Sequence, residues 1–306
     1  MKKFPIIITF VFIAFSVIAQ SNIRLNNYWG NMHFINPASI YDKYEAVFTI
    51  AAREQWYGIN GAPTTFLASG STYLEKYKTQ FGLSLLQDKA GYTTTTNVNL
   101  SYAYEIPIQE FWQLNLGLAG NYQTQLFDIS QIKIIDKDDS FVYPEFLPKR
   151  AWNADVGVEL SNPYFKIGAV TQNLISTFDS VQFQPNTNFV YARFYQNSNN
   201  IFNLGGGICG IQYANIYQAE FNLTGYFKTR QSYGSVNKID LFDLGVFYRT
   251  QSELGLIFGI NLSESLRVTY SYDYHFGSIR FNSFGTNELV LTYNLRRRTA
   301  CKNCWY

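Results

Sequence analysis

The sequence is poor in charge, proline, methionine and cysteine. Charged residues make up 15% of the 306 positions, against roughly 25% in ordinary globular proteins, which is too few for a surface bathed entirely in water. The net charge of +2 gives no reason to expect a nucleic-acid partner. Two methionines and eight prolines stand beside 24 tyrosines and 26 phenylalanines, a composition that favours strands over helices.

Long apolar runs are equally scarce, and the one at the N-terminus has the pattern of a signal peptide. Lys2 and Lys3 form a positive start, residues 6–18 are apolar, and small residues lead to Ala19. This pattern predicts a signal peptide over residues 1–19, cleaved near Ala19. The alternative, an N-terminal membrane anchor, needs a run of roughly 20 apolar residues. An exported chain with so few charges and no second such run is secreted, periplasmic or an outer-membrane barrel.

Alternation of apolar and polar residues decides among these classes. The runs "NVNLSYAYEI" and "SLRVTYSYDYHF" place large apolar side chains on one face and small or polar ones on the other, which is the period of a strand. Such runs are about ten residues long, the length of a tilted strand that crosses a bilayer. Aromatic residues gather at their ends, as at the two membrane interfaces. The sequence therefore predicts an all-β fold, a transmembrane antiparallel β-barrel.

The expected barrel is a single domain of about 14 strands over residues 46–295. Residues 20–45 are expected to form an N-terminal periplasmic segment and residues 296–306 a C-terminal periplasmic tail. The strands are predicted to start near Ala46, Thr64, Gln80, Asn97, Trp112, Trp152, Tyr164, Asn188, Ile201, Ile216, Asp240, Glu253, Leu266 and Glu288. Because bacterial barrels have short periplasmic turns, the long connections 128–150 and 176–187 should lie outside. Residues 228–238 fit this alternation poorly.

The stretch "REQWYGINGAPTTF" predicts how the first strand ends. Trp56 is expected at the level of the lipid headgroups, while Arg53 and Gln55 point into the lumen. Asn60 and Gly61 are expected to supply positive φ at the reversal. Pro63 lacks a backbone N–H and is tolerated just before the next strand is fully paired.

Six segments follow one another over nearly all of the mature chain: "NPASIY", "REQWYGINGAPTTFLASGS", "GLSLLQDKAGYTTTTNVNLSYAYEI", "LGVFYR", "YSYDY" and "NELVLTYNL". In this order they resemble the PorP/SprF family of type IX secretion outer-membrane proteins from Bacteroidetes. The residues taken from these segments as family-motif or structural candidates are Asn36, Pro37, Arg53, Gln55, Trp56, Gly58, Gly61, Pro63, Asp88, Tyr272 and Asp273.

The resemblance implies a non-catalytic outer-membrane barrel of the type IX secretion or gliding machinery. It implies outer-membrane lipid as surroundings, a large secreted adhesin-like protein as a client that the barrel helps to export or to anchor at the cell surface, and periplasmic machinery components as partners. The loop 128–150 is expected to contact the exported protein. A passive or selective channel for small solutes remains the alternative, because the barrel pattern alone permits it equally well.

The hypothesis that the barrel is an enzyme has little support in the sequence. Ser271, Asp273 and His275 share one face of a strand, but residues i and i+4 of a strand lie roughly 13 Å apart, whereas a nucleophile and its base need about 3 Å. No triad can form on that strand alone. The three side chains are explained by a polar lumen, in which Arg267 and Asp273 are expected to belong to one charge network. The other histidine, His33, precedes the first strand without an evident partner. No catalytic, cofactor or metal residue is predicted.

Cysteines and an acidic cluster suggest no metal site either. Cys301 and Cys304 have C-x-x-C spacing, for which a zinc site lacks further ligands nearby and a redox site lacks the preceding helix. A short disulfide or a plain thiol pair is expected in this tail, while Cys209 is expected to be a small buried residue. The acidic group at residues 136–139 lacks the glycine and distal glutamate of a calcium loop.

Overall fold

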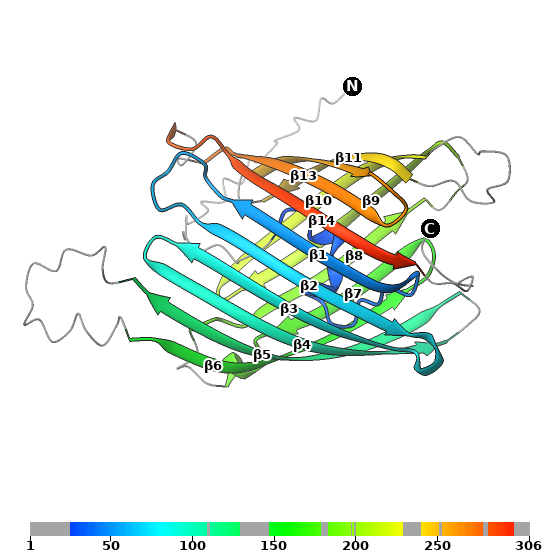
Figure 1. Ribbon diagram of the computed structural model, residues 1–306, viewed down its shortest axis with the longest axis horizontal. Coiled ribbons are helices and arrows are strands. Elements are labelled where there is room, and N and C mark those ends of the chain that lie inside the picture. The colour runs from blue at the N-terminus through cyan, green and yellow to red at the C-terminus, as the bar shows by residue number, and fades with distance from the viewer. Residues whose placement is uncertain are drawn as a thin grey trace, which may run out of the picture.

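The chain folds into a closed barrel of antiparallel strands (Figure 1). The computed structural model describes residues 25–108, 111–128, 147–178, 183–196, 198, 200–228, 240–250, 253–277 and 281–296. The strands are β1 Tyr44–Glu54, β2 Thr64–Leu74, β3 Thr79–Ala90, β4 Thr93–Pro107, β5 Gln113–Phe127, β6 Lys149–Ser161, β7 Phe165–Gln172, β8 Thr187–Tyr195, β9 Phe202–Tyr213, β10 Ile216–Lys228, β11 Asp240–Arg249, β12 Glu253–Asn261, β13 Leu266–His275 and β14 Thr286–Arg296. Each pairs with its neighbour in sequence, and β1 pairs with β14 to close the sheet.

The predicted barrel of about 14 strands is confirmed. β2, β10, β11, β12 and β13 start at the residues expected from the alternation, and the other strands start one to four residues away. The largest differences are at β4, which starts at Thr93, and at β6, which starts at Lys149. Residues 93–96 are all threonines, so no apolar side chain recurs at every second position, which is the pattern that marks a strand facing lipid. They nevertheless pair with residues 124–127 of β5 and lengthen the strand beyond the recognisable pattern.

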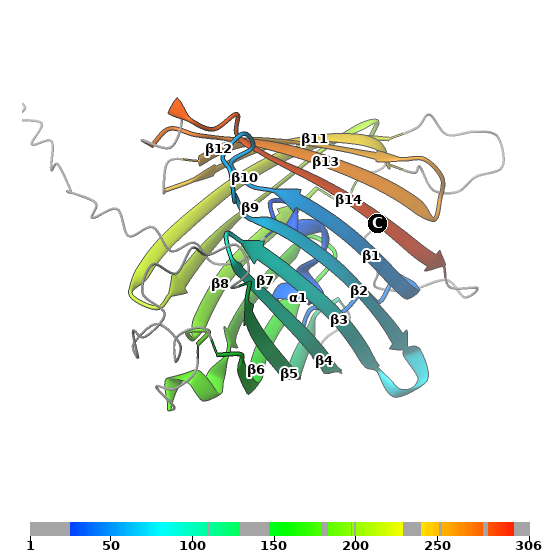
Figure 2. The ribbon, with the colours of Figure 1, turned by 60° about the vertical axis from the view of Figure 1, so that its left-hand side comes forward.

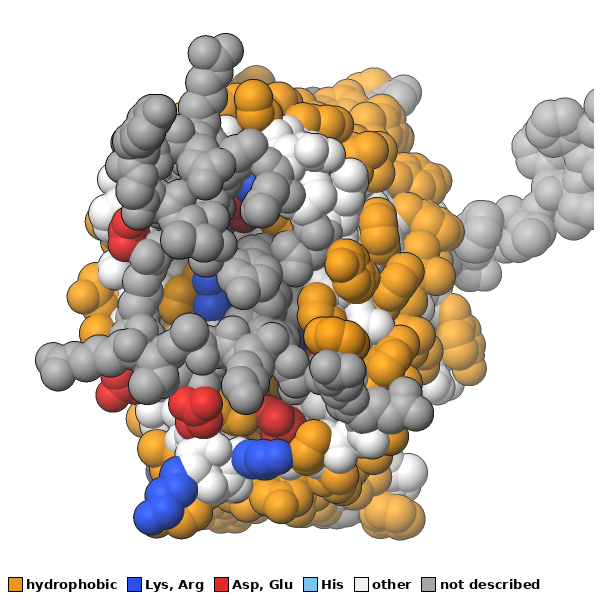
Figure 3. Space-filling model, turned by 90° about the vertical axis from the view of Figure 1, so that its right-hand side faces the viewer, with side chains coloured by type: hydrophobic (Ala, Val, Ile, Leu, Met, Phe, Trp, Pro, Cys, Tyr) orange, Lys and Arg blue, Asp and Glu red, His pale blue; other side chains and the backbone are white. Residues whose placement is uncertain are grey.

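Each strand has one buried and one exposed face. On β12, Leu254, Leu256 and Phe258 are exposed and apolar, whereas Glu253 and Ile257 are buried. The same alternation holds around the barrel, and apolar side chains cover its flank (Figure 3). In water this exposed surface would be unfavourable, but in a bilayer it is the surface that contacts lipid. Within the described residues, no helix has the length and hydropathy needed to cross a bilayer.

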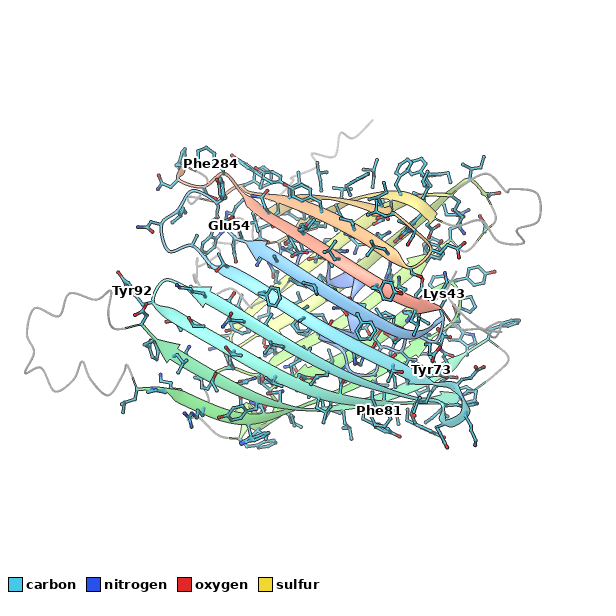
Figure 4. All side chains as sticks on the ribbon, viewed as in Figure 1. Lys43, Glu54, Tyr73, Phe81, Tyr92 and Phe284 are labelled. Atoms are coloured by element: carbon cyan, nitrogen blue, oxygen red, sulfur yellow. The ribbon has the colours of Figure 1, made fainter. Side chains whose placement is uncertain are left out.

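The two ends of the barrel differ in their connections. The two longest connections in the sequence join strand ends on the same side as Glu54 and Tyr92, on the left in Figure 4: one follows β5 and precedes β6, and the other follows β7 and precedes β8. The opposite end holds the start of β1 near Lys43, the end of β14 and several short turns. Because outer-membrane barrels have longer outer loops and shorter periplasmic turns, we assign the end near Glu54 as the outer end. The connection between β10 and β11, which fitted the alternation poorly, lies at the periplasmic end.

The connection from β1 to β2 turns on residues with positive φ. Gly61 has φ +75° as predicted, and its carbonyl accepts the Gly91 N–H at 2.9 Å, whereas the positive φ predicted for Asn60 is not found. Gly58 has φ +97° and lies against Phe284 of the connection between β13 and β14. Trp56 has φ +54°, a strained value for a bulky residue that the sequence did not predict. The reversal is therefore packed against neighbouring outer loops.

Candidate functional site: the filled lumen

The barrel lumen is occupied by the chain's own N-terminal segment. Residues 25–41, which we call the plug, lie inside the ring of strands, where Figure 2 shows the short helix α1. The plug contains the 3₁₀ turn η1 Tyr28–Gly30 and α1 Met32–Ile35. Leu25, Tyr28 and Ile40 are at most 1% exposed. The sequence predicted a periplasmic segment here, and the described part of that segment instead packs within the barrel.

The plug runs from the outer half of the lumen towards the periplasmic end. Leu25 packs in a buried cluster with Ala51, Leu67, Leu86 and Val290, all near the outer ends of their strands. Ile40 packs with Tyr73 and Ala103, near the periplasmic ends of β2 and β4. The plug thus spans much of the length of the barrel before the chain turns into β1.

Carboxylates of the last strands hold the outer part of the plug. Glu288 of β14 accepts the backbone N–H of Asn26 at 2.6 Å and that of Asn27 at 2.9 Å. Asp273 of β13 accepts the Asn26 side-chain amide at 2.6 Å. Both carboxylates are at most 2% exposed. Hydrogen bonds to charged groups are the stronger kind, about 1.5–3 kcal/mol each, so these bonds fix the register of the plug.

An arginine at the centre of the network links the plug to two further carboxylates. Arg249 of β11 lies 2.6 Å from Glu220 and 2.9 Å from Glu253, and donates to the Asn26 side-chain oxygen at 2.9 Å. Glu220 also accepts the indole N–H of Trp29 at 2.9 Å. Because a buried charge is costly without a partner, the network of opposite charges allows these groups to remain in the lumen.

An apolar cluster supports the middle of the plug. Trp29 stacks on Tyr28 with ring centroids 4.9 Å apart and meets the edge of Tyr191 on β8 at 6.2 Å. Arg193 of β8 donates to the Trp29 carbonyl at 2.8 Å. Phe189 and other buried residues of β7, β8 and β9 complete the cluster. The plug therefore has its own contacts with the wall opposite β1 and β14.

The motif residues Asn36 and Pro37 lie where two glycines make room for the plug. Asn36 is fully buried, donates to the Tyr191 hydroxyl at 3.0 Å and to the Val158 carbonyl at 3.2 Å, and accepts the Ala38 N–H. A Cβ atom at Gly157 would overlap the Asn36 side chain, and one at Gly117 would overlap the backbone of residues 37–38. Side chains at these two positions would displace the plug.

His33 is well partnered, contrary to the sequence interpretation. Its Nε2 lies 2.8 Å from the Ser101 hydroxyl, and its Nδ1 lies 2.8 Å from the Gln80 amide nitrogen. Gln80 also accepts the Tyr41 N–H at 2.8 Å and donates to the Ser39 carbonyl at 3.0 Å. Burial lowers the pKa of His33 from 6.5 to about 4, although the Ser39 carbonyl raises it. At neutral pH the imidazole is therefore uncharged.

The other motif residues lie at the outer end of the barrel. Arg53 is buried, donates to the Gln55 side chain at 3.1 Å and lies 3.9 Å from Glu288. Both Arg53 and Gln55 face the lumen, as predicted. Trp56 and Pro63 belong to the connection that follows, where the Gln55 N–H donates to the Pro63 carbonyl at 2.9 Å.

Two further motif residues stabilise neighbouring strands and loops. Asp88 accepts the Thr65 hydroxyl at 2.6 Å across β2 and β3. Tyr272 donates from its hydroxyl to the Phe284 carbonyl at 3.0 Å. Arg267 and Asp273 do not form the pair that the sequence suggested, because Arg267 instead lies 2.6 Å from Asp243. Arg267 and Asp273 lie six positions apart on the extended strand β13, so their side chains do not meet.

The lumen side chains bind the plug through hydrogen bonds and buried ion pairs. Ser271 and Asp273 face the lumen on β13 as predicted, and Asp273 binds Asn26 of the plug. No group of three or more histidine, cysteine or acidic residues in the described ranges could hold a metal ion. Cys209 is buried, as expected from the sequence. Residues 1–24, 129–146 and 297–306, with Ala19, Asp136, Cys301 and Cys304, lie outside the described residues.

Sequence reasoning missed most residues that hold the plug. Those with direct plug contacts include Gln80, Lys166, Gln172, Tyr191, Arg193, Glu220, Arg249 and Glu288. Their signal was present in two forms. Charged residues such as Glu220 and Arg249 occur on the inward face of the strands, and glycines at inward positions such as Gly117 leave space for another backbone.

Comparison with known proteins agrees with this fold. A sequence model described as "Type IX secretion system membrane protein PorP/SprF" matches residues 17–293. No curated protein sequence matches the chain. Among solved structures, a TodX mutant described as a monoaromatic hydrocarbon channel is 7% identical, with a TM-score of 0.52 over 88% of this chain and 95% of its own.

Two other structures have similar scores. The CymD monoaromatic hydrocarbon channel is 12% identical, with a TM-score of 0.50 over 87% of this chain and 93% of its own. The toluene transporter TbuX of Ralstonia pickettii is 11% identical, with a TM-score of 0.49 over 86% of this chain and 92% of its own. At such identities the likeness to TodX and CymD extends to the barrel fold and not to a transported substrate.

Proposed function

Because the chain belongs to the PorP/SprF family of type IX secretion system membrane proteins, we propose that this outer-membrane barrel anchors a large exported protein at the cell surface. The exported protein does not pass through the lumen of this barrel. The observation that carries the proposal is the plug, which is hydrogen-bonded to strands on several sides of the lumen. A polypeptide could cross only after those bonds had broken.

The anchoring role requires binding surfaces outside the lumen. Outer loops are available to an exported client, and the loop 128–150 is our first candidate for that contact. The periplasmic end, where Figure 3 shows Lys, Arg, Asp and Glu side chains, is available to periplasmic machinery. A channel for small solutes, the alternative from the sequence, needs an open path that the plug occupies. A barrel enzyme has no support in the lumen network described above.

The test locks the plug in place and asks whether the client still reaches the surface. The Asn31 side-chain nitrogen lies 3.1 Å from the Ser69 hydroxyl on β2, so Asn31→Cys with Ser69→Cys places two thiols within reach of a short bifunctional crosslinker. The tagged barrel is then extracted from outer membranes in mild detergent and its partners are identified by mass spectrometry. We expect the same large surface protein with the locked and unlocked barrel.

Ser69→Cys alone, treated with the same reagent, is the matched control. Loss of surface display only in the crosslinked double variant would show that the client passes through the lumen and would refute the anchoring role. Removal of residues 129–146 should reduce client recovery. Full recovery without this loop would refute its assignment as the contact surface.

A further inference from the structure

A cavity beside the plug is lined by amides and one carboxylate. It has a volume of about 60 Å³, room for roughly four water-sized groups. Asn97 on β4, Gln123 on β5 and Asp155 on β6 form its polar wall, and Phe34 of the plug with Phe189 on β8 forms an apolar wall. Residues Asn173 and Gln184 of the connection from β7 to β8 also line it, which places the cavity towards the outer end of the barrel.

The polar wall is rich in hydrogen-bond acceptors whose orientation is fixed. Gln123 is 1% exposed, and its Nε2 donates to the side-chain oxygens of Asn121 at 3.0 Å and Asn173 at 2.6 Å. These two bonds fix the amide so that Oε1 faces away from them, and this buried Oε1 has no hydrogen-bond partner within the described part of the chain. The side-chain oxygen of Asn97 is also buried without a partner. A buried acceptor left unpaired is costly, so both oxygens favour a ligand that donates.

The cavity also carries one negative charge, with no cation beside it among the residues that the structure describes. Asp155 is 6% exposed and accepts N–H groups from Asn99, Asn121 and Asn173, at 2.9–3.0 Å. Its Oδ2 accepts one of these bonds, which leaves capacity for another. None of the residues that line the cavity is lysine or arginine, and none of the ion pairs among the described residues includes Asp155. A buried carboxylate favours a cationic partner.

From these features we infer that the cavity binds a primary alkylammonium group, supplied by the side chain of a lysine on a polypeptide at the outer surface. An ammonium donates three hydrogen bonds and accepts none, which matches Gln123, Asn97 and Asp155. Its carbon chain would lie along the apolar wall of Phe34 and Phe189, since lysine stems pack on apolar surface. The volume is sufficient for an ammonium and a short carbon chain and too small for a longer peptide segment. This site does not depend on the proposed secretion role.

The test measures binding of small probes to the purified full-length barrel in detergent by saturation-transfer NMR. Butylammonium should bind at least tenfold more tightly than 1-butanol, its neutral counterpart of equal length. Nα-acetyl-lysine methylamide should bind as well as the free diamine cadaverine. Binding of cadaverine alone would assign the site to free polyamines and overturn the lysine source. Equal binding of butylammonium and 1-butanol, or binding of neither, would overturn the site.

Two variants locate the binding in this cavity. Asp155→Asn keeps the shape and removes the charge, and it should weaken butylammonium binding at least tenfold. Gln123→Leu removes the free acceptor and should weaken it severalfold. Asp243→Asn, the same exchange at a carboxylate already paired with Arg267, is the control and should leave binding unchanged. Heat-modifiable migration in gels verifies that each variant is folded. Unchanged binding in folded Asp155→Asn and Gln123→Leu would contradict the assignment.

Discussion

Oε2 of Glu288 lies 2.6 Å from the backbone nitrogen of Asn26, although 262 positions separate the two residues in sequence. The last strand of the barrel thus binds the first described part of the chain. Since β14 also pairs with β1 to close the sheet, the same strand completes the barrel and holds its plug. Glu288 therefore takes part both in the pairing of β14 with β1 and in holding the plug.

Glu288→Gln should loosen the outer part of the plug. Its two carboxylate oxygens accept two backbone N–H groups, whereas a glutamine amide offers one oxygen and would direct an NH₂ at the other donor. The expected loss is about 1–3 kcal/mol. It is measured as faster hydrogen exchange at Asn26 and Asn27. Glu54→Gln, at an exposed glutamate outside the network, should exchange like the wild type, and equal exchange in the Glu288 variant would refute the role of this carboxylate.

Gly117→Ala should displace the plug near Pro37, whereas Gly120→Ala on the same strand should not. A Cβ at Gly117 would overlap the backbone of residues 37–38, and a Cβ at Gly120 would have no atom within 4 Å. Overpacking of this kind costs about 1–3 kcal/mol. Limited proteolysis of the plug in folded barrels reports the difference. Similar cleavage rates in the two variants would contradict the close packing at Gly117.

Docking of the plug should weaken as the pH falls from about 6.5 to about 4. Burial lowers the pKa of His33 to about 4, so between these values the undocked segment binds more protons than the docked one. The full contribution is present above about pH 6.5 and is lost near pH 4, a difference on the order of 3 kcal/mol. Thiol labelling of Ser39→Cys, a buried plug position, measures opening in a background without the native cysteines, once each rate is divided by that of the same thiol in the unfolded protein at the same pH, because only the thiolate reacts.

His33→Gln is the control for this pH effect. Glutamine keeps a polar side chain beside Ser101 and Gln80 but does not titrate. The labelling rate should then change much less between pH 7 and pH 4. An unchanged pH dependence in His33→Gln would assign the effect to other groups.

Leu256→Arg should destabilise the barrel in lipid by about 2–4 kcal/mol. Leu256 is 63% exposed near the middle of β12, so its side chain faces the hydrocarbon core of the bilayer. Leu262→Arg, at an exposed residue of the turn after β12, should cost about 0–1 kcal/mol because it lies at the interface. Urea unfolding in lipid vesicles measures both. Equal costs would contradict the position of the barrel in the membrane.

The barrel could be predicted from the sequence because a local pattern determines it. Leu254, Leu256 and Phe258 alternate with Glu253 and Ile257, and the period of two identifies a strand whatever it pairs with. Strand ends were less exact where the pattern is uniform, as in the four threonines before Asn97. Lipid outside and a polar lumen inside explain why the exposed face is the apolar one.

The plug could not be predicted because its contacts are not local. Residues 25–41 have neither a strand nor a long helical period, and α1 has only four residues. What holds Asn36 and Trp29 in place is Tyr191, Glu220 and Arg193, on strands far away in sequence. Inward-facing glycines such as Gly82, Gly117 and Gly157 were a local sign that another part of the chain approaches the wall closely.

The most direct test of the account is the conductance of the purified full-length barrel in a planar lipid bilayer. Because the plug fills the lumen and is hydrogen-bonded to the surrounding strands, we predict no steady ion current at neutral pH. A steady single-channel current from the folded wild-type protein would show an open lumen and contradict the account.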